Sequence, residues 1–368
     1  MAITQKYASP TGVTAWASAN SPSAPCSLTE ALANAAAGSL VWLMPGTYSR
    51  SASDSPSGLG TTASPIIFRG YNATPGDLNT RGRLLNGQLN TSGFPVIAYD
   101  ATFGLTLSQY FSLENCVVTG NRDGNLISTA LANLIRQVSV TNASTGASAF
   151  AIASGGNNLV LNLIDAETAS ATSTARAVSV THAASIIDVR AKGAACSAFH
   201  IANSGICLID CVAHGSATGF NVGSSAGSRC TLSRCTAHGC TVVFKLPNSA
   251  VPDDVPVMHA VHFTDCTTVF ENLYAGTANV PIVTIDSRYR DYVTLLSGFG
   301  DSADALGWRF GDILTDGGGA ETDYVDAVAG NFRLKPGSSG TINSGRWPFR
   351  CAGASEAQKP RPSYSQPS

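Results

Sequence analysis

The segments Leu208-Ile209-Asp210-Cys211-Val212-Ala213-His214-Gly215 and Leu232-Ser233-Arg234-Cys235-Thr236-Ala237-His238-Gly239 repeat one order of residue types. The first four positions form a core with a polar third residue and a small or apolar fourth. This core returns at Leu113-Glu114-Asn115-Cys116, Ile135-Arg136-Gln137-Val138, Leu163-Ile164-Asp165-Ala166, Ile186-Ile187-Asp188-Val189, Phe263-Thr264-Asp265-Cys266 and Thr284-Ile285-Asp286-Ser287. The last core residues step by 22, 28, 23, 22, 24, 31 and 21. Such a period is typical of solenoids, propellers and arrays, and short strands with polar corners predict an all-β, right-handed parallel β-helix.

A second apolar motif follows each core by roughly ten residues, so each coil should carry at least two strands with one buried face. The copies are Phe150-Ala151-Ile152, Val178-Ser179-Val180, Phe199-His200-Ile201, Phe220-Asn221-Val222, Phe244-Lys245-Leu246 and Phe270-Glu271-Asn272-Leu273. The polar core residue is mostly Asn or Asp, which tolerate the left-handed conformation of a sharp bend. We therefore predict a corner column of Asn115, Asp165, Asp188, Asp210, Asp265 and Asp286.

The steps from 138 to 166 and from 235 to 266 are longer than the others. Each of these two steps predicts a loop inserted in a coil. The second contains the proline-rich segment 246–256. Insertions on a repeat scaffold form surface loops, often on the binding face.

Composition limits the possible partners. The chain has 368 residues, a net charge of −2, 44% hydrophobic residues and only 12% charged residues. No run of Lys and Arg indicates a nucleic-acid partner, and no apolar stretch is long enough to span a membrane. The sparse charge predicts outer faces that are covered by other chains.

Ten cysteines occur in the chain. One inward column is predicted from Cys116, Cys211, Cys235 and Cys266, with Val138, Ala166 and Val189 at equivalent positions. Exchange with Val and Ala is the behaviour of a small buried apolar residue. Together with the absence of a secretory signal in the first residues, this predicts reduced thiols, a reducing compartment and no metal site.

The ends of the repeat region show a family resemblance. Ser27-Leu28-Thr29-Glu30 is a capping-box pattern that begins a predicted helix over 27–37 with a stop at Gly38, and Val41-Trp42-Leu43-Met44-Pro45-Gly46-Thr47-Tyr48 follows. These segments, with Ser64-Pro65-Ile66-Ile67-Phe68-Arg69-Gly70, resemble the entry of pectate-lyase-like β-helix proteins. The segments 323–326 and 330–338 are similar to the closing coil of that superfamily. The resemblance implies the fold, which hosts lyases, hydrolases, adhesins and viral spikes.

The sequence contains no recognisable catalytic constellation, and we assign no catalytic, cofactor-binding or metal-binding residue. A calcium site needs clustered carboxylates, but the Asp column is explained by its corners and is interrupted by Gln137 and Arg234. Glycoside hydrolysis needs two carboxyls at a defined separation. Asp253-Asp254 lies in the proline-rich segment, and Glu271, Asp286 and Asp291 are the other candidates considered.

His214 and His238 should be neighbours, because they lie one coil apart. Such a pair is able to bind metal or titrate near neutrality, although we interpret it as a solvent-facing corner. His200 is expected on the exposed side of its strand. The segment Arg288-Tyr289-Arg290-Asp291-Tyr292 is either a sugar- or protein-binding patch or a charged strand face.

The sequence leads to two functional hypotheses. The first is a structural or binding protein of a virus particle, such as a bacteriophage head decoration, spike or tail appendage, assembled in the host cytoplasm. It fits the absent signal, the reduced cysteines, the sparse charge and the lack of a catalytic constellation, which argues against an enzyme. The chain also resembles bacteriophage β-helix spike or decoration proteins, and this resemblance favours a trimer. The partners of such a protein would be itself, as a homotrimer, other virion proteins and a host surface glycan. The alternative is a carbohydrate-active enzyme, either a polysaccharide lyase or a glycoside hydrolase. A groove lined by carboxylates favours the enzyme, whereas a featureless lateral face favours the virion protein.

We divide the chain by these expectations. The regions are an N-terminal attachment segment (1–24), the capping helix and first strand (25–50), the parallel β-helix (51–300), a closing coil region (301–351) and a C-terminal tail of disorder-prone composition (352–368).

Overall fold

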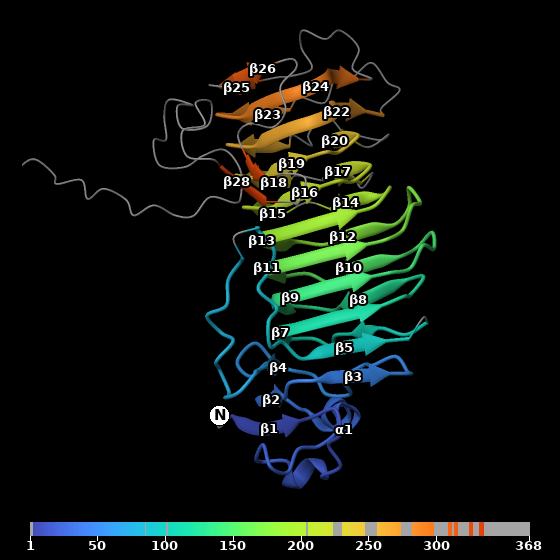
Figure 1. Cartoon of the computed structure of the whole chain (residues 1–368), viewed down its shortest axis with the longest axis vertical. Coiled ribbons are helices and arrows are strands. Elements are labelled where there is room, and N and C mark those ends of the chain that lie inside the picture. Colours follow the sequence, from blue (N-terminus) through green and yellow to red (C-terminus); the bar gives the residue numbers. More distant parts are fainter. Residues whose placement is uncertain are drawn as a thin grey trace, which may run out of the picture.

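The chain forms a right-handed parallel β-helix of about nine coils in a computed structural model, as the repeat predicts (Figure 1). The structure describes residues 3–84, 86–100, 102–203, 205–223, 230–246, 256–273 and 282–297, together with short strands at 308–310, 313–315, 324–326 and 331–334. Over these residues, 26 strands make one continuous sheet in which neighbouring strands run parallel. Among them no helix is long and apolar enough to cross a membrane.

The strands follow one another along the axis in chain order. The first coils contain β1 (Thr4–Ala8), η1 (Trp16–Ser18), α1 (Leu28–Asn34), β2 (Ser39–Leu43), β3 (Thr47–Arg50), β4 (Ile66–Gly70), β5 (Val96–Tyr99) and β6 (Leu105–Thr106). The central coils contain β7 (Phe111–Gly120), β8 (Asn125–Thr129), β9 (Leu134–Asn142), β10 (Phe150–Ser154), β11 (Leu159–Thr168), β12 (Arg176–Val180), β13 (Ala184–Gly193) and β14 (Ser197–Ile201). The later coils contain β15 (Ile206–Ile209), β16 (Val212–His214), β17 (Thr218–Val222), β18 (Cys230–Ser233), β19 (Thr236–His238), β20 (Val242–Leu246), β21 (Val257–His259), β22 (His262–Asn272), β23 (Val283–Ile285), β24 (Arg288–Ser297), β25 (Trp308–Phe310) and β26 (Ile313–Thr315).

One left-handed residue per coil makes the predicted corner. In the coil of β15, β16 and β17, the chain turns at Asp210, whose φ is 55°. The equivalent residues of eight successive coils all have positive φ, namely Asn115, Gln137, Leu163, Asp188, Asp210, Arg234, Ala260 and Asp286. This conformation costs a side-chain-bearing residue roughly 1–2 kcal/mol, which explains why Asn and Asp occupy half of the positions.

Two predicted corners were wrong in register. Ile164 pairs with Val189, so Leu163 and not Asp165 turns the chain in that coil. Ala260 is the corner of the coil in which we predicted Asp265, because Thr236 pairs with His262. Asp265 also has positive φ but lies at a different bend. Successive corners then lie 22, 26, 25, 22, 24, 26 and 26 residues apart, and the two long steps inferred from the sequence disappear.

The inward column after the corner changes with the register. Cys116 pairs with Val138, and Val138 pairs with Ile164. Ile164 and Val261 therefore take the places predicted for Ala166 and Cys266. Cys266 is buried elsewhere, in register with Tyr292. Nine cysteines are described, all are free thiols, and eight are buried, which confirms their behaviour as small apolar residues.

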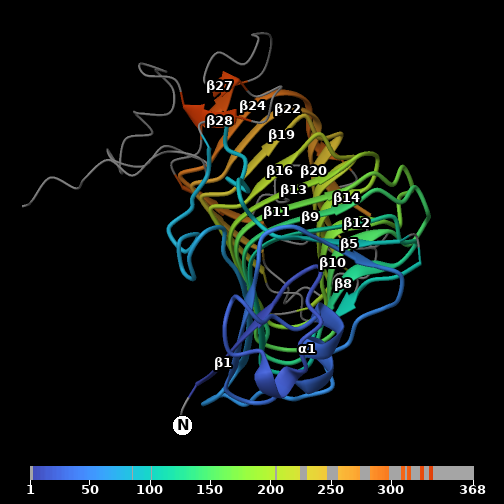
Figure 2. The same cartoon turned by 60° about the horizontal axis from the view of Figure 1, so that its bottom comes forward.

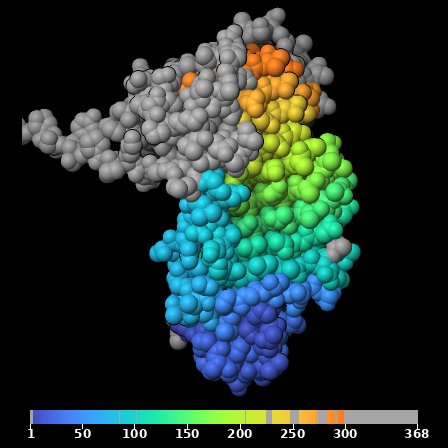
Figure 3. All heavy atoms as spheres, in the orientation of Figure 1, coloured from blue at the N-terminus to red at the C-terminus, as the bar shows by residue number. Residues whose placement is uncertain are grey.

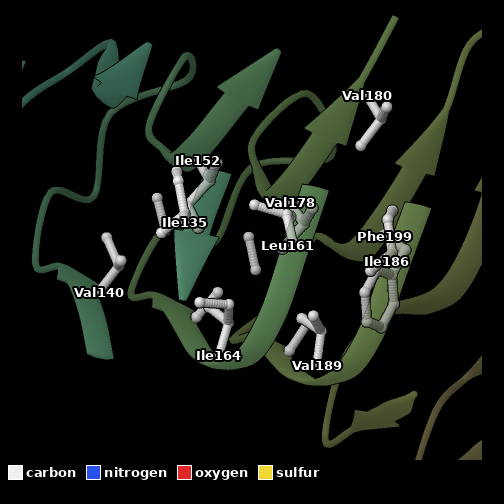
Figure 4. Packing of buried hydrophobic residues seen from close by; sticks show 14 of the residues in the cluster. Ile135, Val140, Ile152, Leu161, Ile164, Val178, Val180, Ile186, Val189 and Phe199 are labelled. Atoms are coloured by element: carbon white, nitrogen blue, oxygen red, sulfur yellow. The ribbon is translucent and has the colours of Figure 1, made fainter. Parts of the chain in front are cut away.

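The second predicted motif forms an internal stack on the opposite sheet. Ile152, Val178, Phe199, Phe220, Phe244, Phe270 and Leu296 are consecutive partners in register. The rings of Phe199 and Phe220 lie parallel, with centroids 5.2 Å apart. Phe150 was wrongly placed in this column, because it pairs with Arg176 and is only half-buried. Figure 4 shows Ile152, Val178 and Phe199 directed into the same interior as Ile135, Ile164 and Val189.

The predicted helix covers the first coil. The hydroxyl of Ser27 accepts a hydrogen bond from the Glu30 amide at 3.1 Å, as the capping-box pattern indicates. The carboxylate of Glu30, however, accepts from the Trp16 amide at 3.2 Å. Leu28, Ala31 and Leu32 are buried in the main core, and Figure 2 shows α1 at that end of the molecule. The helix ends at Asn34, earlier than predicted.

The two ends of the chain refine the predicted division. β1 pairs in parallel with β2, so part of the 1–24 segment belongs to the solenoid. In the predicted closing coil, β27 (Tyr324–Asp326) and β28 (Asn331–Leu334) pair antiparallel in a separate small sheet. The tail 352–368 lies outside the described residues.

The corner column provides a test of backbone conformation. Ala260 has a φ of 52°, so Ala260→Gly should raise the free energy of unfolding by about 1 kcal/mol. Denaturant unfolding measures this difference. The control Ala213→Gly is buried in a strand and should lower stability by about 1 kcal/mol. A destabilising Ala260→Gly change would contradict the corner assignment.

Candidate functional site

A groove runs along the outer side of the strands that follow the corner column. It is a hollow of about 540 Å³. The residues that line it are Gln88, Leu89, Thr91, Ser139, Val140, Thr141, Asp165, Ala166, Glu167, Arg190, Lys192, His214, Gly215, His238 and Gly239. They come from five successive coils, β9, β11, β13, β16 and β19, and from the segment between β4 and β5. With about 4.8 Å per coil, the groove extends roughly 19 Å along the axis, enough for an extended chain.

The floor of the groove is set by strand alternation. Residues two apart on one strand face the same side of a sheet. Ala166, Ala191, Ala213 and Ala237 point inward and are buried. The flanking residues, among them Glu167 and Lys192, which are partners in register, therefore face outward.

One wall is a long segment, residues 71–95, that we call the strap. Figure 1 shows it leaving β4, running along the edge of the coils to the level of β13, and returning to β5. In Figure 3 it covers that flank of the central coils. Leu78, Leu89 and Phe94 form a small apolar cluster against Val117 and Leu163, so the strap packs on the solenoid.

Polar contacts attach the strap to successive corners. Asn115 donates from Nδ2 to Asn79 Oδ1 at 2.9 Å, and Gln137 donates to the Arg81 carbonyl oxygen. Strap residues two apart thus meet corners one coil apart. The strap therefore crosses successive coils along the axis of the solenoid. Arg83 is the next residue in this series and contacts the following coil.

Arg83 binds two adjacent coils at once. Its Nη1 lies 2.5 Å from Asp165 Oδ1 and its Nε 2.6 Å from Asp188 Oδ1. Its Nη2 donates to the carbonyl oxygens of Asp188 and Ile164 at 2.7 and 3.1 Å. Burial opposes the charge of Arg83, but the two carboxylates outweigh it and the pKa of the guanidinium is raised. Burial is also the main cause of a raised pKa at Asp188.

The groove holds two carboxylates, and each is engaged by a cation. The Asp165 carboxylate receives Arg83 and, at 2.7 Å, the Leu89 amide. Glu167 lies 3.0 Å from Lys192 Nζ in a half-exposed pair. The third cation of the groove, Arg190, differs from Arg83 and Lys192 in its contacts.

Arg190 is the cation of the groove without a carboxylate partner among the described residues. Its register partners are Asp165 on one side and Val212 on the other. The side chain is only 8% exposed, and its Nε has no hydrogen-bond partner. Burial lowers the pKa of the guanidinium, although an arginine remains charged. Asp165 and Glu167 are close enough to offset part of this charge but form no ion pair with Arg190. A buried cation without a direct ion-pair partner that lines a groove can bind an anion.

The two histidines lie next to each other, as predicted, because His214 pairs with His238 in register. The expectation that they face solvent was wrong, since His238 is buried and His214 half-buried in the groove. Burial, followed by the charges of Arg190 and Lys192, lowers the pKa of His214 to about 3. The His214 imidazole is therefore neutral at neutral pH.

The other sequence candidates do not join this groove. Asp210 pairs with Arg234 across one coil step, and Asp286 is a buried corner. Glu271 lies 2.9 Å from Lys245 on the other sheet. Asp253 and Asp254 lie outside the described residues, as does the side chain of Asp291.

Two further expectations concern single side chains. His200 is half-buried rather than exposed, and burial lowers its pKa to about 4. Tyr289, at the centre of the predicted binding patch, is fully buried and lies 5.7 Å from Phe263 and 5.5 Å from Phe270, measured between ring centroids. Among the described residues, no group of three or more His, Cys, Asp or Glu side chains could hold a metal ion.

Sequence reasoning missed Arg190, Lys192 and the strap. The signal for the first two was the alternation after each corner, in which a small inward residue is flanked by polar outward ones, as in Val189-Arg190-Ala191-Lys192. The signal for the strap was 25 residues rich in Asn, Gly and Thr without strand alternation between 70 and 96. Loops of that length in a compact fold are usually either functional or disordered.

Comparison with known proteins supports the fold. No protein-family model matches the chain, and no curated protein matches it. The solved pectate lyase Pel9A is 14% identical, superposes with a TM-score of 0.53 and is matched over 97% of each chain. A rhamnogalacturonan lyase is 11% identical with a TM-score of 0.57, over 88% of this chain and 90% of that one. A viral protein, Geobacillus virus E2 ORF18, reaches a TM-score of only 0.30, which is too low to bear on function.

Proposed function

We propose that the chain is a carbohydrate-active β-helix enzyme that binds an acidic polysaccharide in the groove and cleaves it by β-elimination. The observation that carries this proposal is Arg190, a buried cation without a carboxylate partner among the described residues, on the floor of a groove that crosses five coils. A repeating anionic polymer is a ligand that fits both the length of the groove and its charge.

The residues of the groove can be given roles in such a reaction. Arg190 would bind the carboxylate of a uronic acid and stabilise the negative charge that develops there. A base would remove the proton from carbon 5 of that sugar. The electron pair of the broken bond forms the double bond between carbons 4 and 5, and the glycosidic oxygen leaves carbon 4 and takes up a proton from water.

His214 is the candidate base. Its imidazole is neutral and is able to accept a proton. A bound carboxylate would raise the pKa of His214 by counteracting the nearby charges of Arg190 and Lys192, which brings the imidazole closer to the range in which a base works. Lys192, held by Glu167 at 3.0 Å, would add a second positive charge beside the sugar chain.

Elimination fits the groove better than hydrolysis. A glycosidase uses two carboxyl groups, one as acid and one as base or nucleophile. Of the two carboxylates in the groove, Asp165 has both oxygens engaged by the strap and Glu167 pairs with Lys192. The solved lyases with TM-scores above 0.5 also use this fold, which supports a lyase as an occupant of the scaffold.

This proposal takes the alternative of the two hypotheses raised by the sequence. The virion hypothesis expected a featureless lateral face, whereas the described face carries a groove with two carboxylates. A homotrimer, attachment to other virion proteins and a location on a virus particle stay predictions. A depolymerase carried on a virus particle would keep the location predicted by the first hypothesis but not its lack of enzymatic activity.

A panel of polysaccharides tests the proposed function. We expect polygalacturonate or alginate to yield unsaturated products, detected by their ultraviolet absorbance, with a neutral glucan as the control. Elimination creates the double bond, so absorbance and reducing ends should rise together. Reducing ends without unsaturation would indicate a hydrolase, and a panel of acidic polysaccharides that neither binds nor reacts would overturn the proposal.

A further inference from the structure

Asp165 and Arg190 carry opposite charges on neighbouring strands but form no ion pair with each other. They are partners in register on β11 and β13, and neighbouring strands lie only about 4.8 Å apart. Opposite charges placed directly across two strands ordinarily attract one another. No ion pair joins them, because both oxygens of Asp165 are directed to the strap.

The strap holds Asp165 through two contacts of different strength. The Arg83 guanidinium supplies a charge-assisted hydrogen bond at 2.5 Å to Oδ1, and the Leu89 amide supplies one at 2.7 Å to Oδ2. The guanidinium is itself fixed by Asp188 and two carbonyl oxygens on neighbouring coils. Arg83 therefore competes with Arg190 for the same carboxylate and is better placed.

We propose that Arg83 is a positioning residue that keeps the Asp165 carboxylate away from Arg190, so that Arg190 stays available to an anionic ligand. The inference rests on the proposed function, because it concerns the same groove. The strap would then do more than form one wall of the groove. By binding the Asp165 carboxylate, the strap prevents this internal anion from occupying the Arg190 guanidinium.

The test uses three variants of the full chain and an oligogalacturonate as the probe. In Arg83→Gln, Asp165 loses its strongest partner and should turn to Arg190, so the dissociation constant for the probe should rise roughly tenfold. In Arg83→Gln/Asp165→Asn the carboxylate that lies in register with Arg190 is gone, and most of the affinity should return. Asn79→Ala removes a strap contact to Asn115 without touching Asp165, and its affinity should match that of the wild type.

A crystal structure of Arg83→Gln gives a readout that does not depend on the probe. We expect the Asp165 carboxylate to lie within ion-pair distance of Arg190. An Asp165 that still faces the strap would overturn the inference, and so would a double variant that binds no better than Arg83→Gln, since the loss would then come from a displaced strap. If the wild type does not bind the probe, the proposed function is contradicted, and the position of Asp165 in the Arg83→Gln structure alone decides the role of Arg83.

Discussion

Arg190→Gln should weaken the binding of an acidic oligosaccharide by about one hundredfold and remove most of its cleavage. A hydrogen bond to a charged group contributes roughly 1.5–3 kcal/mol, and Arg190 offers its charge from a buried position where solvent screens it little. Glutamine keeps hydrogen-bonding capacity and much of the length of the side chain but not the charge. Calorimetric titration of the wild type and the variant with an oligogalacturonate measures the difference.

The structure offers a matched control for this change. Arg176 is likewise an arginine whose Nε is buried without a hydrogen-bond partner, and burial lowers its pKa as well. It belongs to β12 on the other sheet and does not line the groove. Arg176→Gln should therefore leave the affinity unchanged. Equal losses in the two variants would show that the effect comes from general destabilisation, and no loss in Arg190→Gln would remove the main support for the proposed groove function.

Phe220→Ala should lower the free energy of unfolding by about 3–5 kcal/mol, the usual cost of truncating a buried phenylalanine. Phe220 is fully buried in the internal stack and faces Phe199 at 5.2 Å. The change leaves a cavity between two coils and removes a stacking contact. Because a solenoid is stabilised by contacts between neighbouring repeats, the coils on both sides should lose stability.

Phe150→Ala is the comparison for this prediction. Phe150 has the same side chain but is half-buried and outside the stack, so we expect a loss below about 2 kcal/mol. Denaturant midpoints followed by circular dichroism distinguish the two variants. A Phe150→Ala variant as unstable as Phe220→Ala would contradict the assigned register of the second sheet.

The interior and the groove place different demands on the same strands. After each corner, inward residues such as Ala191 must be small or apolar to fill the coil. The outward residues on either side can be polar or charged, because they do not pack in the interior. Arg190 and Lys192 can therefore line the groove without disturbing the repeat. This separation lets the scaffold carry a binding site on one face at little cost to its stability.

The residue order alone predicted the solenoid, the capping helix and the buried cysteines. Each of these follows from short-range patterns: the corner residues tolerate positive φ, Ser27 caps a helix three residues before Glu30, and apolar residues alternate along each strand. The register was predicted for most coils. The predicted register was wrong in the two coils where Leu163 and Ala260 occupy the corner. Neither residue type indicates a left-handed conformation, and an Asp lies a few residues further on in each coil, at 165 and 265.

The tertiary structure alone decided the site. Arg83 meets Asp165 across 82 residues and Asp188 across 105, a pairing that depends on how the strap lies across the coils and not on any local spacing. Whether Arg190 has an ion-pair partner depends on that contact, because the strap binds the carboxylate of the adjacent Asp165. Repeats specify a scaffold through local rules that recur in every coil, whereas a site formed between an insertion and several coils arises only once the coils have stacked.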